Sequence, residues 1–202
     1  MIKIAVLVSG GGTNLQAILD KEKQGLLNGE VSLIVASKDN IYAIERAKKA
    51  DKKYVVICKK DYESKEKYEE ALLDILNSEN IDLIVLAGYL NILSEDFIKK
   101  YPERIINIHP SLIPSFCGDG MYGLKVHEAA LNYGVKLSGA TVHYVNEVTD
   151  GGKIILQKAI EVKEDDSPES LQKRIMENCE WIILPEAINI VCEKIRKEKQ
   201  DV

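Results

Sequence analysis

Asn107 and His109 are the residues of this sequence best suited to chemistry. They end the apolar run in Arg104–Phe116, which reads RIINIHPSLIPSF. Side chains two residues apart in a strand point to the same side, and an amide N–H beside an imidazole can stabilise a developing oxyanion. A lone histidine in such a place would as readily be a buried structural hydrogen bonder, but the neighbouring amide favours a catalytic pair.

A carboxylate partner for this imidazole is available in Asp150, within the turn Val148–Gly152. Asp-Gly pairs are common in hairpin loops, so ordinary turn chemistry would by itself explain Asp150. His143 lies on the strand that leads into the same turn, and it could point into the site or into the core. We expect His127, within Lys125–Glu128, on the surface of a helix.

A glycine-rich turn, Ser9–Asn14, follows the first apolar run and precedes a helical pattern. Backbone amides and the helix dipole at such a place can bind an anion. No Gly-Lys-Ser/Thr follows, and a leucine stands where the dinucleotide fingerprint needs its third glycine, so neither phosphate-loop signature fits. A single phosphate held by Gly12, Thr13 and Asn14 fits better than a pyrophosphate. The alternative is that the glycines only permit a tight turn.

Short β-branched runs alternate with helical patterns and must position these groups. We expect strands over 2–8, 31–36, 53–58, 82–87, 104–108, 136–146 and 152–162, and helices over 14–27, 41–50, 62–77, 95–100 and near 126–131. A final helix begins near Asp166, and Pro185 should kink or interrupt it. This order predicts an α/β fold, a Rossmann-like, open, mostly parallel twisted sheet of about seven strands. Helices should cover both faces, with an antiparallel strand near the C-terminal part.

The composition narrows the function classes. With 202 residues, 46% of them hydrophobic, the chain suits one domain with a substantial core. A formal charge of −5 without a dense basic block argues against nucleic-acid binding. The first apolar run, Ile4–Val8, is too short for a signal peptide or a membrane span. Four scattered cysteines favour reduced thiols over disulfides or a metal site, so we expect a cytoplasmic protein without a metal.

Five segments in order resemble one enzyme family. They are Ser9–Ala17, Val85–Tyr89, Asn107–Pro114, Gly139–His143 and Asp150–Gly152. Each is modest alone, but the ordered set resembles the folate-dependent phosphoribosylglycinamide formyltransferases over nearly the whole chain. The resemblance implies one formyltransferase domain over 1–202, with a nucleotide-phosphate-binding half over about 1–100 and a catalytic and folate-binding half over about 101–202.

The resemblance also implies the reaction and its participants. The formyl group of 10-formyltetrahydrofolate, the co-substrate, would pass to the amine of glycinamide ribonucleotide in de novo purine biosynthesis, by direct attack through a tetrahedral oxyanion. Asn107, His109 and Asp150 would be the catalytic residues, with the histidine as cation and general acid. The nucleotide would contact Gly12, Thr13, Asn14, Pro110 and Glu180, and the folate would contact Leu86, Leu90, Asn91, Ile92, Leu93, Ile98 and the backbone of 146–150. A monomer or homodimer without nucleic-acid, membrane or metal partners is implied.

Some positions depart from the family pattern, and some alternatives stay open. Asn91 stands where several members carry arginine, Trp181 replaces a histidine common after the acidic residue, and the segment 117–125 is longer than in many members. A formyltetrahydrofolate hydrolase would normally carry an additional N-terminal domain, and a methionyl-tRNA formyltransferase a basic C-terminal one, so both are disfavoured. A non-catalytic nucleotide-phosphate-binding module or a Rossmann-like oxidoreductase would leave the Asn107, His109 and Asp150 set without a role.

Overall fold

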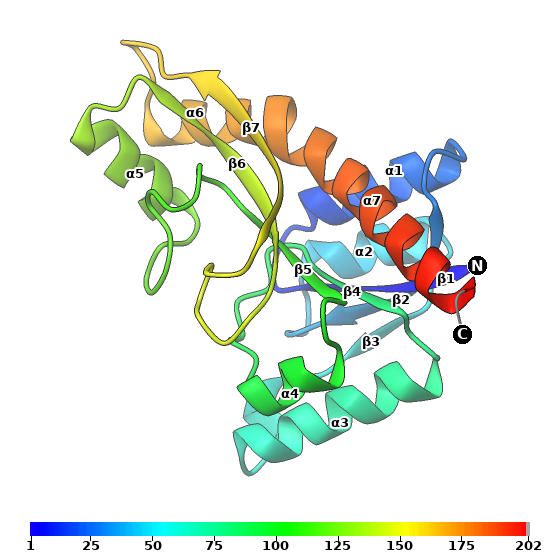
Figure 1. Ribbon diagram of the computed structural model, residues 1–202. Helices are drawn as coiled ribbons and strands as arrows, with labels where there is room; N and C mark the ends of the chain where they lie inside the picture. The colour runs from blue at the N-terminus through cyan, green and yellow to red at the C-terminus, as the bar shows by residue number, and fades with distance from the viewer. Residues whose placement is uncertain (201–202) are drawn as a thin grey trace.

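Seven strands form one sheet in the computed structural model, which describes residues 1–200 (Figure 1). The strands are β1 (Ile2–Val8), β2 (Gly29–Ala36), β3 (Tyr54–Val56), β4 (Leu83–Leu86), β5 (Ile105–His109), β6 (Leu137–Tyr144) and β7 (Ile154–Glu161). Their order is β3-β2-β1-β4-β5-β6-β7. Neighbouring strands from β3 to β5 run parallel, whereas β5–β6 and β6–β7 are antiparallel pairs. The predicted mostly parallel α/β sheet is confirmed.

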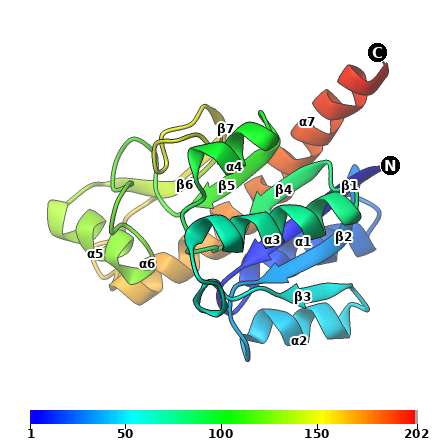
Figure 2. The same cartoon turned by 90° about the horizontal axis from the view of Figure 1, so that it is seen from below.

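Helices cover both faces of the sheet (Figures 1 and 2). They are α1 (Thr13–Lys23), α2 (Tyr42–Lys49), the 3₁₀ turn η1 (Lys59–Asp61), α3 (Lys65–Ser78), α4 (Glu95–Lys100), α5 (Leu124–Tyr133), α6 (Pro168–Ile175), the π-helical turn η2 (Met176–Glu180) and α7 (Trp181–Gln200). One hydrophobic core lies beneath α1, α2, α6 and α7. A second core lies beneath α3 and α4 on the opposite face.

The alternation of side chains along β1 separates these two cores. Ile4, Val6 and Val8 belong to the core under α1 and α7, whereas Ala5 and Leu7 belong to the core under α3. All five are fully buried. A strand buried on both faces has no polar side to show, which is why its sequence is a continuous apolar run.

Local side-chain chemistry sets several helix boundaries. Ser64 and Ser94 accept hydrogen bonds from backbone N–H groups in the first turns of α3 and α4. Ser167 forms a reciprocal capping box with Ser170, and a proline follows at the first helical position of α6. The first helix ends at Lys23, earlier than predicted, because Gly25 turns the chain with a φ of 72°.

Pro185 does not interrupt the last helix, so the predicted break is wrong. The helix α7 is continuous from Trp181 to Gln200 with Pro185 inside it. The irregularity comes earlier, in the π-helical turn η2 directly before Trp181. The N–H that Pro185 lacks would have bonded to the carbonyl of Trp181, where hydrogen bonding is already irregular, so the proline removes little there.

The strand order brings separate parts of the sequence to one edge. The chain leaves β1 toward one side of the sheet, to β2 and β3, and leaves β4 toward the other side, to β5. At such a reversal, a crevice opens at the carboxyl ends of the parallel strands. The glycine-rich turn follows β1, the segment from Gly88 follows β4, and His109 ends β5. All three therefore face the same crevice.

Candidate active site

Asn107 and His109 lie on β5, which is paired with a neighbouring strand along each edge. It pairs in parallel with β4, where Asn107 lies opposite Leu86. It pairs antiparallel with β6, where Asn107 lies opposite His143 and His109 opposite Thr141. A strand paired along both edges has little freedom to shift, so the two polar side chains stand on a fixed base.

Asp150 approaches both of these side chains from the turn after β6. Its Oδ2 lies 3.4 Å from His109 Nδ1, and its Oδ1 accepts a hydrogen bond of 3.3 Å from Asn107 Nδ2. The backbone N–H of Gly118 donates to the same carboxylate over 3.0 Å. The structure thus brings together the amide, the imidazole and the carboxylate that the sequence singled out, although Asp150 lies more than 40 residues from the other two.

The imidazole of His109 is enclosed by acceptors. Its Nε2 lies 2.9 Å from the carbonyl oxygen of Phe116, while Nδ1 faces Asp150. A carbonyl and an ionised carboxylate can only accept hydrogen bonds. An imidazolium, which has an N–H on each ring nitrogen, satisfies both partners at once.

His143 points into the site, which decides between its two predicted placements. Its Nδ1 lies 2.8 Å from the carbonyl of Tyr144 and must donate to it, which leaves Nε2 as an acceptor in the neutral ring. Asn107 Nδ2 lies 3.1 Å from that Nε2. His143 therefore orients the Asn107 amide with its nitrogen toward the carboxylate of Asp150, which lies 3.6 Å from Nε2.

The environment of Asp150 keeps it ionised. Burial alone would raise the pKa of this carboxyl group. The nearby His143 side chain, the hydrogen bond from the Gly118 N–H and the charge of His109 act in the opposite direction and outweigh burial, so the pKa of Asp150 is lowered.

The glycine-rich turn leads into α1 through a left-handed residue, Gly12, with a φ of 70°. Asn14 follows in the first turn, and its Nδ2 donates a 2.6 Å hydrogen bond to Glu180 Oε2 in η2. Both side chains are buried, and within residues 1–200 the buried Oδ1 of Asn14 has no hydrogen-bond partner. Burial raises the pKa of Glu180 to about 6, although the bond from Asn14 opposes this shift. Asn14 and Glu180 thus form a polar pair with an unused acceptor.

These groups line one cavity of about 400 Å³. Its walls include Thr13, Asn14, Asn107, His109, Pro110, Asp150 and Glu180. Of the residues predicted to bind nucleotide, only Gly12 is not in its wall. The glycine-containing segment 118–123 lies along the same cavity, and its Gly118 bonds to Asp150.

A second, adjoining cavity contains every residue predicted to contact folate. Its lining includes Leu86, Leu90, Asn91, Ile92, Leu93 and Ile98, together with residues 145–150. Asn107 and Asp150 line both cavities. Tyr89, Leu90, Ile92 and Thr149 also line both. The polar groups that could handle a transferred group therefore lie at the boundary between the two spaces.

The chain is similar to proteins of known family. A family model described as formyl transferase matches residues 2–188. The phosphoribosylglycinamide formyltransferase of Haemophilus influenzae is 39% identical over 185 residues, covering 92% of this chain and 84% of that protein. The crystal structure of glycinamide ribonucleotide transformylase 1 from Symbiobacterium toebii has a TM-score of 0.90 at 41% identity, covering 96% of this chain and 89% of that one.

This chain belongs to the phosphoribosylglycinamide formyltransferase family. The same similarity reaches larger relatives. The chicken trifunctional purine biosynthetic protein adenosine-3 is 39% identical over 190 residues, but these represent only 18% of its length. The chloroplastic phosphoribosylglycinamide formyltransferase of Arabidopsis thaliana is 38% identical over 200 residues, 68% of its length.

Asn91, which departs from the family pattern, is tied to a pair of tyrosines. Its Nδ2 donates a 3.1 Å hydrogen bond to the hydroxyl of Tyr68, which is also hydrogen bonded to the hydroxyl of Tyr89. Both tyrosines are buried, and burial raises the pKa of each phenol. Asn91 therefore anchors the segment after β4 to α3 as well as lining the folate cavity.

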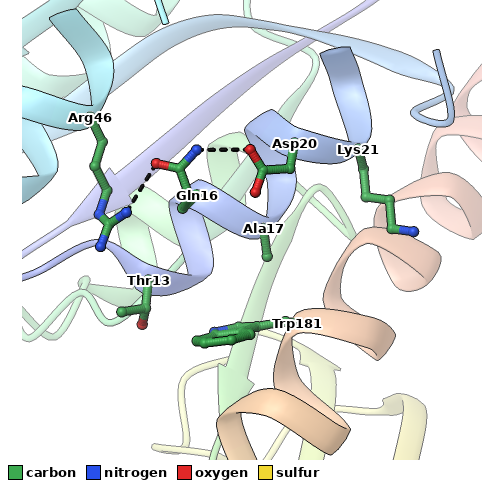
Figure 3. A pocket seen from close by; sticks show the side chains of 7 residues that line it. All are labelled: Thr13, Gln16, Ala17, Asp20, Lys21, Arg46 and Trp181. Atoms are coloured by element: carbon green, nitrogen blue, oxygen red, sulfur yellow. Dashed lines mark hydrogen bonds between the residues drawn. The ribbon is translucent and has the colours of Figure 1, made fainter. Parts of the chain in front are cut away.

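Trp181, the second residue that departs from the family pattern, does not line the 400 Å³ cavity. It is the first residue of α7 and lines a separate space of about 270 Å³ (Figure 3). The other lining residues belong to α1, among them Thr13, except for Arg46 of α2. Thr13 alone lines both this space and the 400 Å³ cavity. The departure at Trp181 thus affects the outer side of the glycine-rich turn.

His127 is buried, so the prediction of a surface position is wrong. It lies in α5 with no exposed area and borders the 400 Å³ cavity. Within residues 1–200 neither ring nitrogen has a hydrogen-bond partner. Burial and the charge of His109 lower its pKa to about 4. Its helical spacing to Ala130 and Leu131, which continue one apolar face, is the sequence signal that could have revealed this burial.

Residues 1–200 contain neither a metal-binding cluster nor a membrane-spanning helix. No cluster of three or more histidine, cysteine, aspartate or glutamate side chains is placed to hold a metal ion. None of the helices combines the length and apolar character needed to cross a membrane.

Proposed function

We propose that this chain transfers the formyl group of 10-formyltetrahydrofolate to the primary amine of glycinamide ribonucleotide, in de novo purine biosynthesis, through the groups Asn107, His109 and Asp150. The observation that carries the proposal is the convergence of these groups where two cavities meet. Membership of the phosphoribosylglycinamide formyltransferase family supports the choice of both substrates.

In this proposal each substrate occupies its own cavity. The nucleotide phosphate lies at Gly12, Thr13 and Asn14, where the start of α1 provides backbone N–H donors. The carboxylate of Glu180 and the free Oδ1 of Asn14 accept hydrogen bonds from the nucleotide. The folate lies along the cavity that follows β4, with its formyl group beside Asn107 and Asp150.

Formyl transfer then proceeds by direct attack. The amine adds to the formyl carbon, and the carbonyl oxygen becomes an oxyanion that accepts hydrogen bonds from the Asn107 amide and the His109 imidazolium. Orienting both substrates in this way contributes on the order of 7 to 11 kcal/mol to lowering the barrier. Collapse of the tetrahedral adduct breaks the bond from carbon to the folate nitrogen, which takes up a proton as the former amine loses one.

Each donor must exchange one protein partner for the substrate. His109 Nε2 releases the carbonyl of Phe116, and Asn107 releases the 3.3 Å bond to Asp150, the longer of its two bonds. Asp150 stays ionised, preserves the positive charge on His109, and accepts the amine proton through water. His109 thus acts as cation and general acid, Asn107 stabilises the oxyanion, and Asp150 sets the charge of His109 and relays the amine proton.

Loss of the oxyanion donor tests the proposal. Purified protein is mixed with a formyl folate analogue whose ultraviolet absorbance changes on transfer, and we expect the change only when glycinamide ribonucleotide is added. His109→Ala and Asp150→Asn should each lower kcat by about 100- to 1000-fold. Circular dichroism and thermal unfolding verify that both variants are folded.

A matched variant separates direct attack from a thiol intermediate. Cys117 lies on the loop beside the site, and burial together with the charge of Asp150 raises the pKa of its thiol. We expect Cys117→Ser to retain the wild-type rate, because a suppressed thiolate is no nucleophile. Folded His109→Ala or Asp150→Asn protein with most of the activity would refute the assignment. Absorbance change without the nucleotide would indicate a hydrolase.

We also propose three coarser properties. The chain acts as a single formyltransferase domain, with a nucleotide-binding half over about 1–100 and a catalytic and folate-binding half over about 101–202. It works as a monomer or homodimer, which light scattering can decide. It is cytoplasmic, in keeping with the four free cysteines, Cys58, Cys117, Cys179 and Cys192, since reduced thiols suit a reducing compartment.

A further inference from the structure

The charge balance around the nucleotide site leaves a requirement unmet. A phosphate monoester carries nearly two negative charges at neutral pH. The 400 Å³ cavity includes the carboxylates of Asp119, Asp150 and Glu180, and no lysine or arginine of the described chain lines it. The imidazolium of His109 also lines it, but this charge is already paired with Asp150. The helix dipole at α1 supplies only about half a positive charge. A dianion placed there needs a cation from outside this cavity.

Arg46 on α2 lies directly behind the glycine-rich turn. Its Nε donates a 2.8 Å hydrogen bond to the carbonyl of Gly11, and its Nη1 donates a 3.0 Å bond to the side chain of Gln16. A Cβ placed on Gly12 would lie 3.4 Å from Cδ of Arg46. The guanidinium group is therefore held beside the backbone that would bind the phosphate.

The remaining donors of Arg46 are unused. A guanidinium has five N–H groups, and the two bonds above occupy two of them. The Tyr42 ring stacks under the guanidinium at 4.9 Å and fixes its plane without using a donor. In Figure 3 the side chain of Thr13 lies between Arg46 and Trp181. Thr13 is also the residue that opens onto the nucleotide cavity.

We infer that Arg46 is a substrate-binding residue that supplies the positive charge for the nucleotide phosphate held at Gly12, Thr13 and Asn14. This inference rests on the proposed function for the identity of the nucleotide. The buried, unpartnered Oδ1 of Asn14 is an independent sign that a ligand completes this end of the cavity. Arg46 contacts the phosphate from the outer side of the turn, whereas Asn14 and Glu180 face the nucleotide from the inner side.

Substitution of Arg46 should change nucleotide affinity and little else. We expect Arg46→Gln to raise the KM for glycinamide ribonucleotide by about 10- to 100-fold, the effect of one charge-assisted hydrogen bond. The KM for the folate and kcat should stay within about threefold of wild type, since Arg46 lines neither of the two cavities that Asn107 and Asp150 border. Arg46→Lys keeps the charge and should recover at least half of the loss on a logarithmic scale.

A second variant separates charge from structural support. Gln16→Ala removes the side-chain partner of Arg46 but leaves the cation, so its KM for the nucleotide should stay within about threefold of wild type. If Gln16→Ala or Arg46→Lys behaves like Arg46→Gln, the effect arises from the hydrogen bonds that hold the turn, and the inference is wrong. An unchanged nucleotide KM in Arg46→Gln also overturns it.

Binding without turnover distinguishes this inference from the proposed function. Trp181 is the single tryptophan of the chain and lines the same space as Arg46 and Thr13. Inorganic phosphate, ribose 5-phosphate and ribose are titrated, with Trp181 fluorescence and calorimetry as readouts. We expect the two phosphates to bind, ribose to bind more weakly, and Arg46→Gln to abolish the difference. If the wild type binds phosphate, Arg46→Gln does not, and the protein transfers no formyl group, then the proposed function is wrong but the role of Arg46 stands. Absence of phosphate binding to the wild type, by both readouts, would overturn the role of Arg46.

Discussion

At the scale of single residues, the ionised carboxylate of Glu180 lowers the stability of the free protein but is suited to bind the nucleotide. Its carboxyl group is buried in η2, where burial raises its pKa from 4.5 to about 6. Because the folded-state pKa lies above the unfolded value, the stability that this group contributes is greatest below pH 4.5. That contribution is lost as pH rises through 6. The ionised carboxylate at neutral pH therefore lowers the free energy of unfolding, and a hydrogen bond from a ligand can offset this loss.

We expect Glu180→Gln to stabilise the free protein and to weaken nucleotide binding. The gain in the free energy of unfolding should be at most about 2 kcal/mol above pH 6 and should vanish below pH 4.5. Chemical unfolding at pH 4 to 8, together with the KM for glycinamide ribonucleotide, measures both effects. Exposed Glu186 on α7 provides the matched control in Glu186→Gln, which should show neither effect. A pH-independent change in Glu180→Gln would contradict this account.

Site residues can be predicted from the sequence where the residue type and the position in the fold both indicate a ligand site. Asn107 and His109 lie at the carboxyl end of β5, where parallel sheets place ligands, and Asp150 lies in the turn after β6, so their convergence is foreseeable. Arg46 was not found, because its hydrogen bond to Gly11 crosses 35 residues and no motif marks it. His127 was misplaced because its charged neighbours concealed the apolar face behind it.

At the scale of elements, the three glycines of the turn after β1 are not equivalent. A Cβ on Gly10 would contact nothing within 4 Å, whereas one on Gly12 would lie 2.8 Å from the Cβ of Ala43. Gly12 also has a φ of 70°, which disfavours any residue with a side chain. Only Gly12 is therefore needed for the turn itself.

Alanine substitutions should separate these roles. We expect Gly12→Ala to lower the free energy of unfolding by about 1 to 3 kcal/mol, from strain and from the clash with α2. Gly10→Ala should change it by less than about 0.5 kcal/mol. Thermal and urea unfolding of both variants compare the two positions under one condition. Equal destabilisation of the two would show that the contact with Ala43 does not govern the turn.

The elements themselves were predictable from hydrophobic periodicity, and their ends less so. The strand β1 and the helix α4 match their predicted ranges, because a glycine turn and a serine cap mark their ends. The edge strand β3 is only Tyr54–Val56, shorter than the predicted 53–58, because only these three residues pair with β2. The π-helical turn before α7 depends on packing against the sheet, which no local pattern encodes.

At the scale of the whole molecule, substrate binding should stabilise the fold. The nucleotide cavity is built from segments near residues 13, 107, 150 and 180, which are close together only in the folded chain. A ligand that binds only the native state at 100 times its Kd raises the free energy of unfolding by about 2.7 kcal/mol.

We therefore expect glycinamide ribonucleotide to raise the thermal midpoint of the wild type, and to raise it less in Arg46→Gln at the same concentration. Differential scanning fluorimetry over a concentration series checks this. Ribose at equal concentration is the control ligand and should have little effect. An equal shift with ribose, or none with saturating nucleotide, would contradict the prediction.

The double pairing of β5 has a consequence for how the site adjusts. The main chain beneath Asn107 is paired with both β4 and β6, and that beneath His109 is paired with β6, whereas Asp150 lies in the connection 145–153 between β6 and β7. A ligand that presses on this edge would therefore displace the connection that carries the carboxylate more easily than the strand that carries the amide and the imidazole. The alignment of Asn107 and His109 should accordingly tolerate substitutions in 145–149 better than the position of Asp150 does.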